Sequence, residues 1–205
     1  MTVYGYLADL VLDSLGLGWL RSGGMRVRFL QPVYDGDDLS ITFEDHIAAA
    51  KRLDGTLCAT GEILWPESEP PELVQYPEAA LPAERPPASA TSLAPGSILG
   101  TMRTSVSLPP GEPMTPAALL ELSNYVLMRN VKLGPWIHAA SELRHFSLAR
   151  NGDELGVRAR VADRFERKGN QFVVLDILVV ADGVRLIQQV RHTAIYEPRL
   201  RFAGG

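Results

Sequence analysis

The longest amphipathic pattern in the chain lies in its second half and predicts one helix. Apolar residues recur there at helical spacing and form one broad face. Thr115 suits the N-cap, Pro116 suits the first helical position, and Gly134-Pro135 ends the run. The apolar positions are Leu119, Leu120, Leu122, Val126, Leu127 and Val131. We therefore expect a single central helix that packs this face on a sheet.

Strand-like segments surround this helix and are separated by short turns. One precedes the helix and four follow it, over about 101–108, 136–148, 155–167, 171–180 and 184–196. The turns between the later segments are Asn151-Gly152, Lys168-Gly169-Asn170 and Asp182-Gly183. Such short turns dictate an antiparallel meander, so the pattern predicts a sheet wrapped around one helix.

The first half of the chain repeats this plan in a shorter form. Its pattern predicts a helix over about 3–15 and strands over about 25–30, 39–49 and 56–65. Three landmarks recur 116 positions later, namely Leu17-Gly18, Arg28 and Gly36-Asp37. The turn Asp54-Gly55 recurs 128 positions later, so the first copy is shorter by about 12 residues, roughly one strand with its turn. We expect two related α+β repeats, the first of them shortened.

Proline divides the two repeats. Eight prolines fall between positions 66 and 98, where they disfavour both helix and central strand. We therefore assign 1–65 to a first, shortened repeat, 66–98 to a Pro-rich linker and 99–200 to a second, complete repeat. The two repeats can join into one continuous sheet, in which each covers an open edge of the other.

Composition argues against several classes of function. The chain has 20 basic and 24 acidic residues and a net charge of -4, too balanced for the basic footprint that duplex nucleic acid demands. Its one cysteine, Cys58, allows neither an internal disulfide nor a Cys-rich zinc site, and indicates a reducing compartment. No apolar run approaches about 18 residues, and no basic segment begins a signal peptide. We expect a cytoplasmic protein that neither binds nucleic acid nor spans a membrane.

Segments of the first half resemble the MaoC-like acyl hydratase/dehydratase family. They are Tyr4-Gly-Tyr-Leu-Ala-Asp-Leu, Gly23-Gly-Met-Arg-Val-Arg-Phe-Leu-Gln-Pro-Val and Asp35-Gly-Asp-Asp-Leu. In that family a helix is followed by an Arg-Phe-x-x-Pro-Val strand and then a Gly-Asp turn. The resemblance implies a double hotdog fold and an acyl-thioester ligand in a tunnel beside the helix. It also implies coenzyme A or acyl carrier protein as the carrier, no separate cofactor, and a homodimer or heteromer of hotdog subunits.

The catalytic dyad of that family is missing from this chain. The family places an Asp and a His five residues apart, just before the central helix. In the second repeat Glu112 could replace the acid, but Ala117 stands at the histidine spacing, and the matching stretch of the first repeat would precede Met1. Three functions therefore stay open: hydration or dehydration of an acyl thioester, its hydrolysis, and a non-catalytic role as acyl binder or partner subunit.

Two histidines are the first candidates for chemistry. His138 follows the helix stop, where an imidazole could act as a general base or hydrogen-bond the thioester carbonyl. Regular strand geometry puts Glu142 on the face of His138 and Ser141 on the other face, so we expect a His138/Glu142 pair. His192 lies on the last strand and suits a buried second acid or base.

Two further candidates lie outside these histidines. Asn124 stands within the apolar helix and resembles the Asp or Asn with which some hotdog thioesterases hold the attacking water. Arg191 precedes His192 and suits a surface contact with a phosphate of coenzyme A. The sequence shows no nucleotide loop, zinc pattern or nucleophile elbow, so we expect no metal site.

Overall fold

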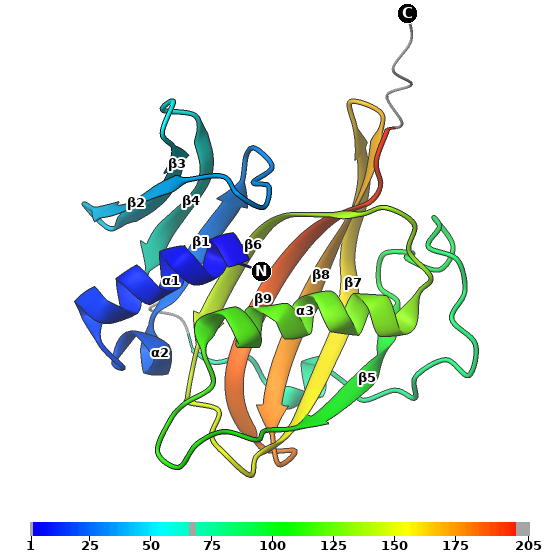
Figure 1. Ribbon diagram of the computed structural model, residues 1–205. Helices are drawn as coiled ribbons and strands as arrows, with labels where there is room; N and C mark the ends of the chain where they lie inside the picture. The colour runs from blue at the N-terminus through cyan, green and yellow to red at the C-terminus, as the bar shows by residue number, and fades with distance from the viewer. Residues whose placement is uncertain (1, 66–68, 200–205) are drawn as a thin grey trace, which may run out of the picture.

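The structure is a computed structural model and describes residues 2–65 and 69–199. Within these ranges nine strands form one antiparallel sheet (Figure 1). In chain order they are β1 (Gly24–Phe29), β2 (Leu39–Glu44), β3 (Ile47–Arg52), β4 (Leu57–Leu64), β5 (Ile98–Ser105), β6 (Ile137–His145), β7 (Glu154–Arg167), β8 (Asn170–Ala181) and β9 (Arg185–Glu197). Their order across the sheet is β2-β3-β4-β1-β6-β9-β8-β7-β5. The strands of the first half of the chain therefore lie together, and those of the second half continue the sheet.

Strands β1 and β6 join the two halves into one sheet, as the sequence predicted. They run antiparallel and pair Gly24 with Arg144 and Arg28 with Ala140. At the centre of this crossing Arg26 lies opposite Glu142, which is 116 positions later in the chain. The Arg26 side chain donates to the Glu142 carboxylate at 2.8 Å.

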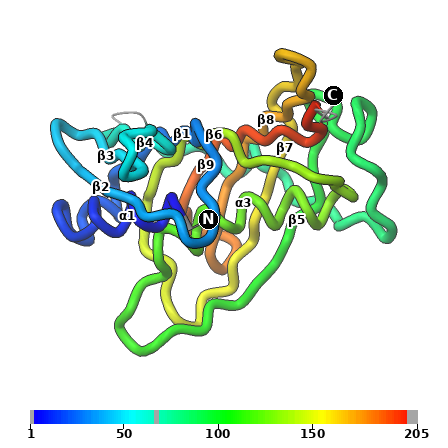
Figure 2. Tube along the Cα trace, turned by 45° about the horizontal axis from the view of Figure 1, so that its top comes forward, coloured from blue at the N-terminus to red at the C-terminus, as the bar shows by residue number. Residues whose placement is uncertain are grey.

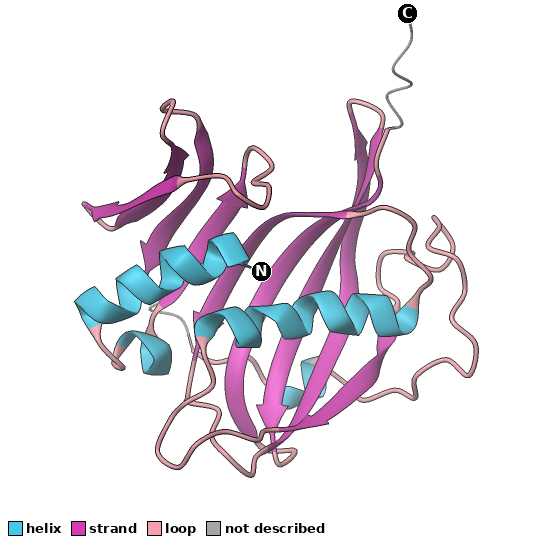
Figure 3. Ribbon diagram, viewed as in Figure 1, coloured by secondary structure: helices cyan, strands magenta, loops and turns pink. Residues whose placement is uncertain are grey.

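The α-helices lie on one face of the sheet (Figure 3). α1 (Thr2–Leu15) packs on β2, β3 and β4, while α3 (Pro116–Asn130) packs on β5, β7 and β9. α1 also contacts α3 and the short α2 (Trp19–Ser22). Thr115 caps α3 as predicted, because its hydroxyl accepts from the Ala118 amide at 3.3 Å. The buried core lies between these helices and the sheet.

The segment between the halves covers part of the opposite face. It contains the short 3-10 helix η1 (Leu73–Gln75), followed by Tyr76, which packs on Leu178 and Val180 of β8. Further along, the amide of Thr101 in β5 donates to the Ala79 carbonyl at 2.8 Å. Figure 2 shows the rest of the segment looping beyond the β7–β5 end of the sheet.

The first half differs from the expectation in one place. The strand predicted over 39–49 is a hairpin of β2 and β3, which turns at Asp45 and His46 with φ values of 47° and 65°. Left-handed turns without glycine are uncommon, and Asp and His mark them only weakly, so the pattern of turn residues did not predict this one. The expected loss of a whole strand is also wrong. Instead β2 and β3 have six residues each, whereas β7 and β8 have 14 and 12.

Candidate functional site

A β-bulge at the start of β6 shapes the candidate site. The pairing of β6 with β9 shifts register between His138 and Ala140, so one extra residue is inserted there. The insertion changes the face on which the preceding side chain lies. As a result His138 Nε2 lies 2.8 Å from the hydroxyl oxygen of Ser141.

Ser141 links His138 to a second histidine. Its hydroxyl oxygen also lies 3.2 Å from Nδ1 of His192 on β9. Ser141 is 2% exposed and His192 is fully buried, whereas His138 is half-buried. The two imidazole centroids are 4.3 Å apart, and the Phe29 ring lies 4.7 Å from that of His138 on its other side. The three polar side chains therefore form a compact chain that runs from a partly open position to the core.

The serine hydroxyl couples the protonation of the two rings. It carries one hydrogen, so it can donate to one imidazole while it accepts from the other. His138 Nδ1 and His192 Nε2 have no hydrogen-bond partner among the described residues. If His138 donates to Ser141, its Nδ1 is a proton acceptor; if His138 accepts, its Nδ1 carries a proton that it can donate. The cluster can thus present either a base or an acid.

Both imidazoles are neutral near pH 7. Burial lowers the pKa of His138 to about 4. Burial, together with the neighbouring His138, lowers the pKa of His192 well below its ordinary value of 6.5. The charged form of each ring is disfavoured because little water or counter-charge is available to solvate it.

A groove of about 720 Å³ reaches His138. It lies between the start of α1, the end of β1 with the residues that follow, and the start of β6. Besides His138 it is lined by Val3, Phe29, Leu30, Gln31, Pro32, Val33, Tyr34, Cys58, Ile137, Ala139 and Ile195. Its described lining is mostly apolar and contains neither Asp nor Glu.

Glu142 does not join His138, so the expected His138/Glu142 pair is wrong. The bulge places His138 on the face of Ser141, and Glu142 lies on the opposite face of the sheet, where it binds Arg26. No glycine marks the bulge, which is why regular alternation was assumed. Ser141, which regular alternation predicts on the other face, is accordingly a residue of the site.

The remaining candidates lie away from the groove. Arg191 is exposed on the face of Glu142 and donates to Asp176 at 3.0 Å. Asn124 is half-buried on α3, its side-chain oxygen has no partner among the described residues, and it is not one of the residues that line the groove. Of the predicted set, the structure thus brings together His138 and His192. In the described part of the chain no three His, Cys, Asp or Glu side chains are grouped to hold a metal ion.

Comparison with solved structures identifies the fold. Rv0216 of Mycobacterium tuberculosis, described as a double hotdog protein, matches with a TM-score of 0.57 over 93% of this chain and 80% of its own, at 15% identity. The chain has a double hotdog fold. An isomerase-inactive variant of GphF DH1 shares it, with a TM-score of 0.55, 16% identity and coverage of 97% of this chain and 83% of its own.

The name of a third structural match includes an activity. It is a putative thioesterase from Novosphingobium aromaticivorans, with a TM-score of 0.54 and 15% identity over 96% of this chain and 86% of its own. Neither the protein-family models nor the curated proteins give a match. The predicted fold class is therefore confirmed by structure alone. None of the helices in the described ranges is long and apolar enough to cross a membrane.

Proposed function

We propose that this protein binds an acyl thioester in the groove at His138 and catalyses hydration or dehydration of the acyl part. The observation that carries the proposal is a neutral imidazole at the wall of an apolar groove, held by Ser141 and backed by His192. Ligand sites of this kind combine an apolar lining with a few fixed polar groups. The resemblance to MaoC-like sequences and the double hotdog fold point to the same substrate class.

His138 is the acid–base group of the proposed reaction. In dehydration its Nδ1 takes a proton from the carbon next to the thioester carbonyl. The bond from the next carbon to its hydroxyl then breaks, and the same proton passes from His138 to the departing hydroxyl. The products are water and a 2-enoyl thioester, and hydration is the reverse. Because one imidazole both takes and returns the proton, the step needs no second titrating residue.

Ser141 and His192 act as positioning residues. When Ser141 accepts from His138 Nε2 and donates to His192 Nδ1, His138 Nδ1 keeps a free lone pair. Because Nδ1 is itself buried, a substrate in the groove must displace the side chains that cover this atom. Full transfer of a charge to His192 is disfavoured, because burial lowers the pKa of that ring. His192 therefore holds the serine hydroxyl in one orientation.

Two other functions fit the site less well. Hydrolysis could use a water molecule held by a carboxylate, but the described lining of the groove contains no carboxylate. Hydrolysis is nevertheless the second candidate, because a fold relative is described as a putative thioesterase. A non-catalytic partner subunit would have its pocket filled by side chains, whereas this groove is open.

The test is an assay of purified protein with enoyl, 3-hydroxyacyl and saturated thioesters of coenzyme A and of acyl carrier protein. Enoyl absorbance and free thiol are followed together. We expect a change in enoyl absorbance without thiol release, and its loss in His138→Ala. His46→Asn is the matched control, because His46 lies in an exposed turn at φ 65°, which Asn tolerates.

The outcomes separate the candidates. Thiol release that depends on His138 would assign the protein to the thioesterases and overturn the hydration proposal. Activity that survives His138→Ala would remove His138 from the mechanism. Inactivity with every thioester, while the protein is folded by circular dichroism, would favour the non-catalytic role.

A further inference from the structure

A row of alternating charges crosses the face of the sheet opposite the helices. Six side chains lie in direct register on six neighbouring strands, from β4 to β7. In order they are Glu62, Arg26, Glu142, Arg191, Asp176 and Arg160. Ion pairs join Arg26 to both neighbouring glutamates and Asp176 to both neighbouring arginines. The row thus divides into a group with one excess negative charge and a group with one excess positive charge.

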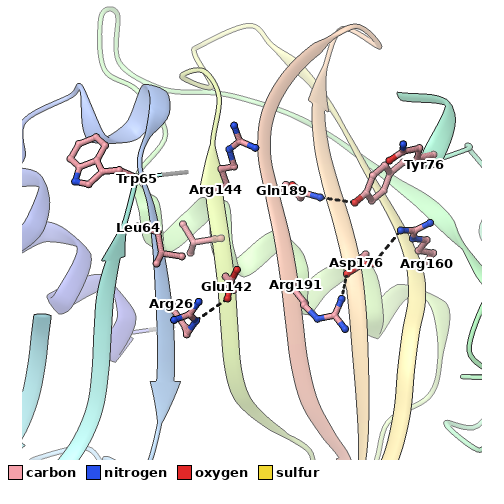
Figure 4. A pocket seen from close by; sticks show the side chains of 12 residues that line it. Arg26, Leu64, Trp65, Tyr76, Glu142, Arg144, Arg160, Asp176, Gln189 and Arg191 are labelled. Atoms are coloured by element: carbon pink, nitrogen blue, oxygen red, sulfur yellow. Dashed lines mark hydrogen bonds and ion pairs between the residues drawn. The ribbon is translucent and has the colours of Figure 1, made fainter. Parts of the chain in front are cut away.

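All of the row except Glu62 lines a hollow of about 520 Å³ and forms its floor (Figure 4). Leu64 and Trp65 form one side of the hollow, and Tyr76 of the connecting segment forms the other. Tyr76 is held in place because its hydroxyl accepts from the Gln189 side chain at 2.8 Å. The walls therefore come from segments far apart in the sequence, and the hollow is part of the folded architecture.

Positive charge and hydrogen-bond donors are in excess in this hollow. Four arginines line it, against the two carboxylates of Glu142 and Asp176. Arg160 and Arg191 share the Asp176 carboxylate, and each directs one terminal nitrogen to it, at 3.3 and 3.0 Å. A guanidinium has five N–H donors, so most donors of these two side chains are not used by Asp176.

We propose that this hollow is a binding site for a small organic diphosphate, separate from the groove at His138. Guanidinium groups match the oxygens of phosphoryl groups in geometry and charge. Arg191 and Arg160 stand two strands apart, a separation of about 10 Å at the backbone, which their long side chains can close around two linked phosphoryl groups. Trp65 is 52% exposed at the rim and offers an apolar surface to the organic part.

The experiment titrates the full-length protein with inorganic pyrophosphate, ADP and sulfate. Binding is measured by calorimetry and by tryptophan fluorescence, to which Trp65 contributes at the hollow. We expect pyrophosphate and ADP to bind and sulfate to bind at least tenfold more weakly. Arg191→Ala is expected to weaken pyrophosphate binding about tenfold or more, since one charge-assisted contact group is lost. Arg191→Lys keeps the positive charge but loses the paired N–H donors of the guanidinium. We expect its pyrophosphate affinity to lie between those of the wild-type protein and Arg191→Ala.

Arg28→Ala is the matched control. Arg28 is exposed on β1, two residues from Arg26, and does not line the hollow. Equal weakening by Arg28→Ala and Arg191→Ala, or equal binding of sulfate and pyrophosphate, would show unselective anion attraction and overturn the proposal. Lack of binding at millimolar pyrophosphate would overturn it as well. His138→Ala is expected to leave pyrophosphate binding unchanged, so this proposal and the one on the groove fail independently.

Discussion

His138 and Ser141 are hydrogen-bonded at 2.8 Å although a regular strand would place them on opposite faces. One inserted residue in β6 produces this contact. The contact in turn connects the groove to His192, which lies entirely within the core. The proposed acid–base group therefore depends on a backbone irregularity as much as on its own side chain.

Replacement of the bridging serine tests this dependence. In Ser141→Ala neither imidazole is held by the hydroxyl, so His138 has no fixed proton arrangement. We expect kcat to fall roughly tenfold to a hundredfold, less than the factor of about 10²–10⁴ that general acid–base catalysis itself contributes, with little change in KM. Ser105→Ala on the exposed edge of β5 is the control. Equal kcat in Ser141→Ala and the control would rule out the positioning role.

Acid is expected to destabilise the fold in a window set by buried histidines. Burial lowers the pKa of His145 to about 3 and that of His138 to about 4. The unfolded histidines titrate near 6.5, so below that pH the unfolded chain binds protons that the folded chain does not. The free energy of unfolding should therefore fall as the pH drops from about 6.5 to about 4, by about 1.4 kcal/mol per pH unit for each such histidine.

Urea unfolding at several pH values between 6.5 and 4.5 measures this slope. His145→Gln is expected to reduce the pH dependence of the unfolding free energy by the contribution of one histidine, about 1.4 kcal/mol per pH unit. This holds whatever the variant does to stability at pH 7. The two groups for which carboxylate pKa values are lowered, Asp37 and Asp54, titrate below this window. An unchanged slope in the variant would show that His145 is not the buried neutral group described.

Asn130 is expected to matter for stability far more than Asn124 does. Asn130 accepts from the Gly100 amide at 2.6 Å and donates to the Gly100 carbonyl at 2.9 Å, which fixes the end of α3 to β5. Asn130→Ala leaves both buried backbone groups without these partners, at a cost of about 2–4 kcal/mol. Asn124→Ala should change the free energy of unfolding by less than about 0.5 kcal/mol. Chemical denaturation of both variants measures the two free energies of unfolding. Similar losses in Asn130→Ala and Asn124→Ala would contradict the structural role given to Asn130.

Gly24 is expected to be required at the junction of the two halves. A Cβ at this position would lie 2.3 Å from the Leu143 carbonyl oxygen on β6. Gly24→Ala must therefore push β1 and β6 apart, and we expect a loss of about 1–3 kcal/mol or more in thermal or urea unfolding. Gly18→Ala is the control, because Gly18 has a φ of -58° and no atom within 4 Å of the added Cβ. A tolerated Gly24→Ala would contradict the close approach.

Most of the fold could be predicted because local signals agreed with one another. Thr115 and Pro116 marked the start of α3, and Asn151-Gly152 and Asp182-Gly183 marked two turns of the meander. The β2–β3 turn was missed because Asp45 and His46 adopt left-handed backbone without a glycine. Asp and His adopt this conformation more often than most residues, but much less often than glycine, so the signal was too weak to predict the turn.

The candidate site was predictable in part only. His138 and His192 could be proposed as single residues, because buried or loop-adjacent histidines suggest proton chemistry. The hydrogen-bonded connection between these two histidines could not be predicted, because it runs through Ser141 and depends on the bulge after His138. Arg191 and Glu142 were assigned to separate roles, yet they face each other in one row across the sheet.

The Arg26–Glu142 pair has a consequence for how such a molecule can evolve. Two identical subunits joined by antiparallel strands bring the same residue from each copy to the centre of the crossing, so a charged residue there faces a residue of the same charge. In this chain the two facing positions, 116 residues apart, are encoded separately and carry opposite charges. A tandem chain can thus make its halves complementary at the position where a symmetric pair is obliged to be alike.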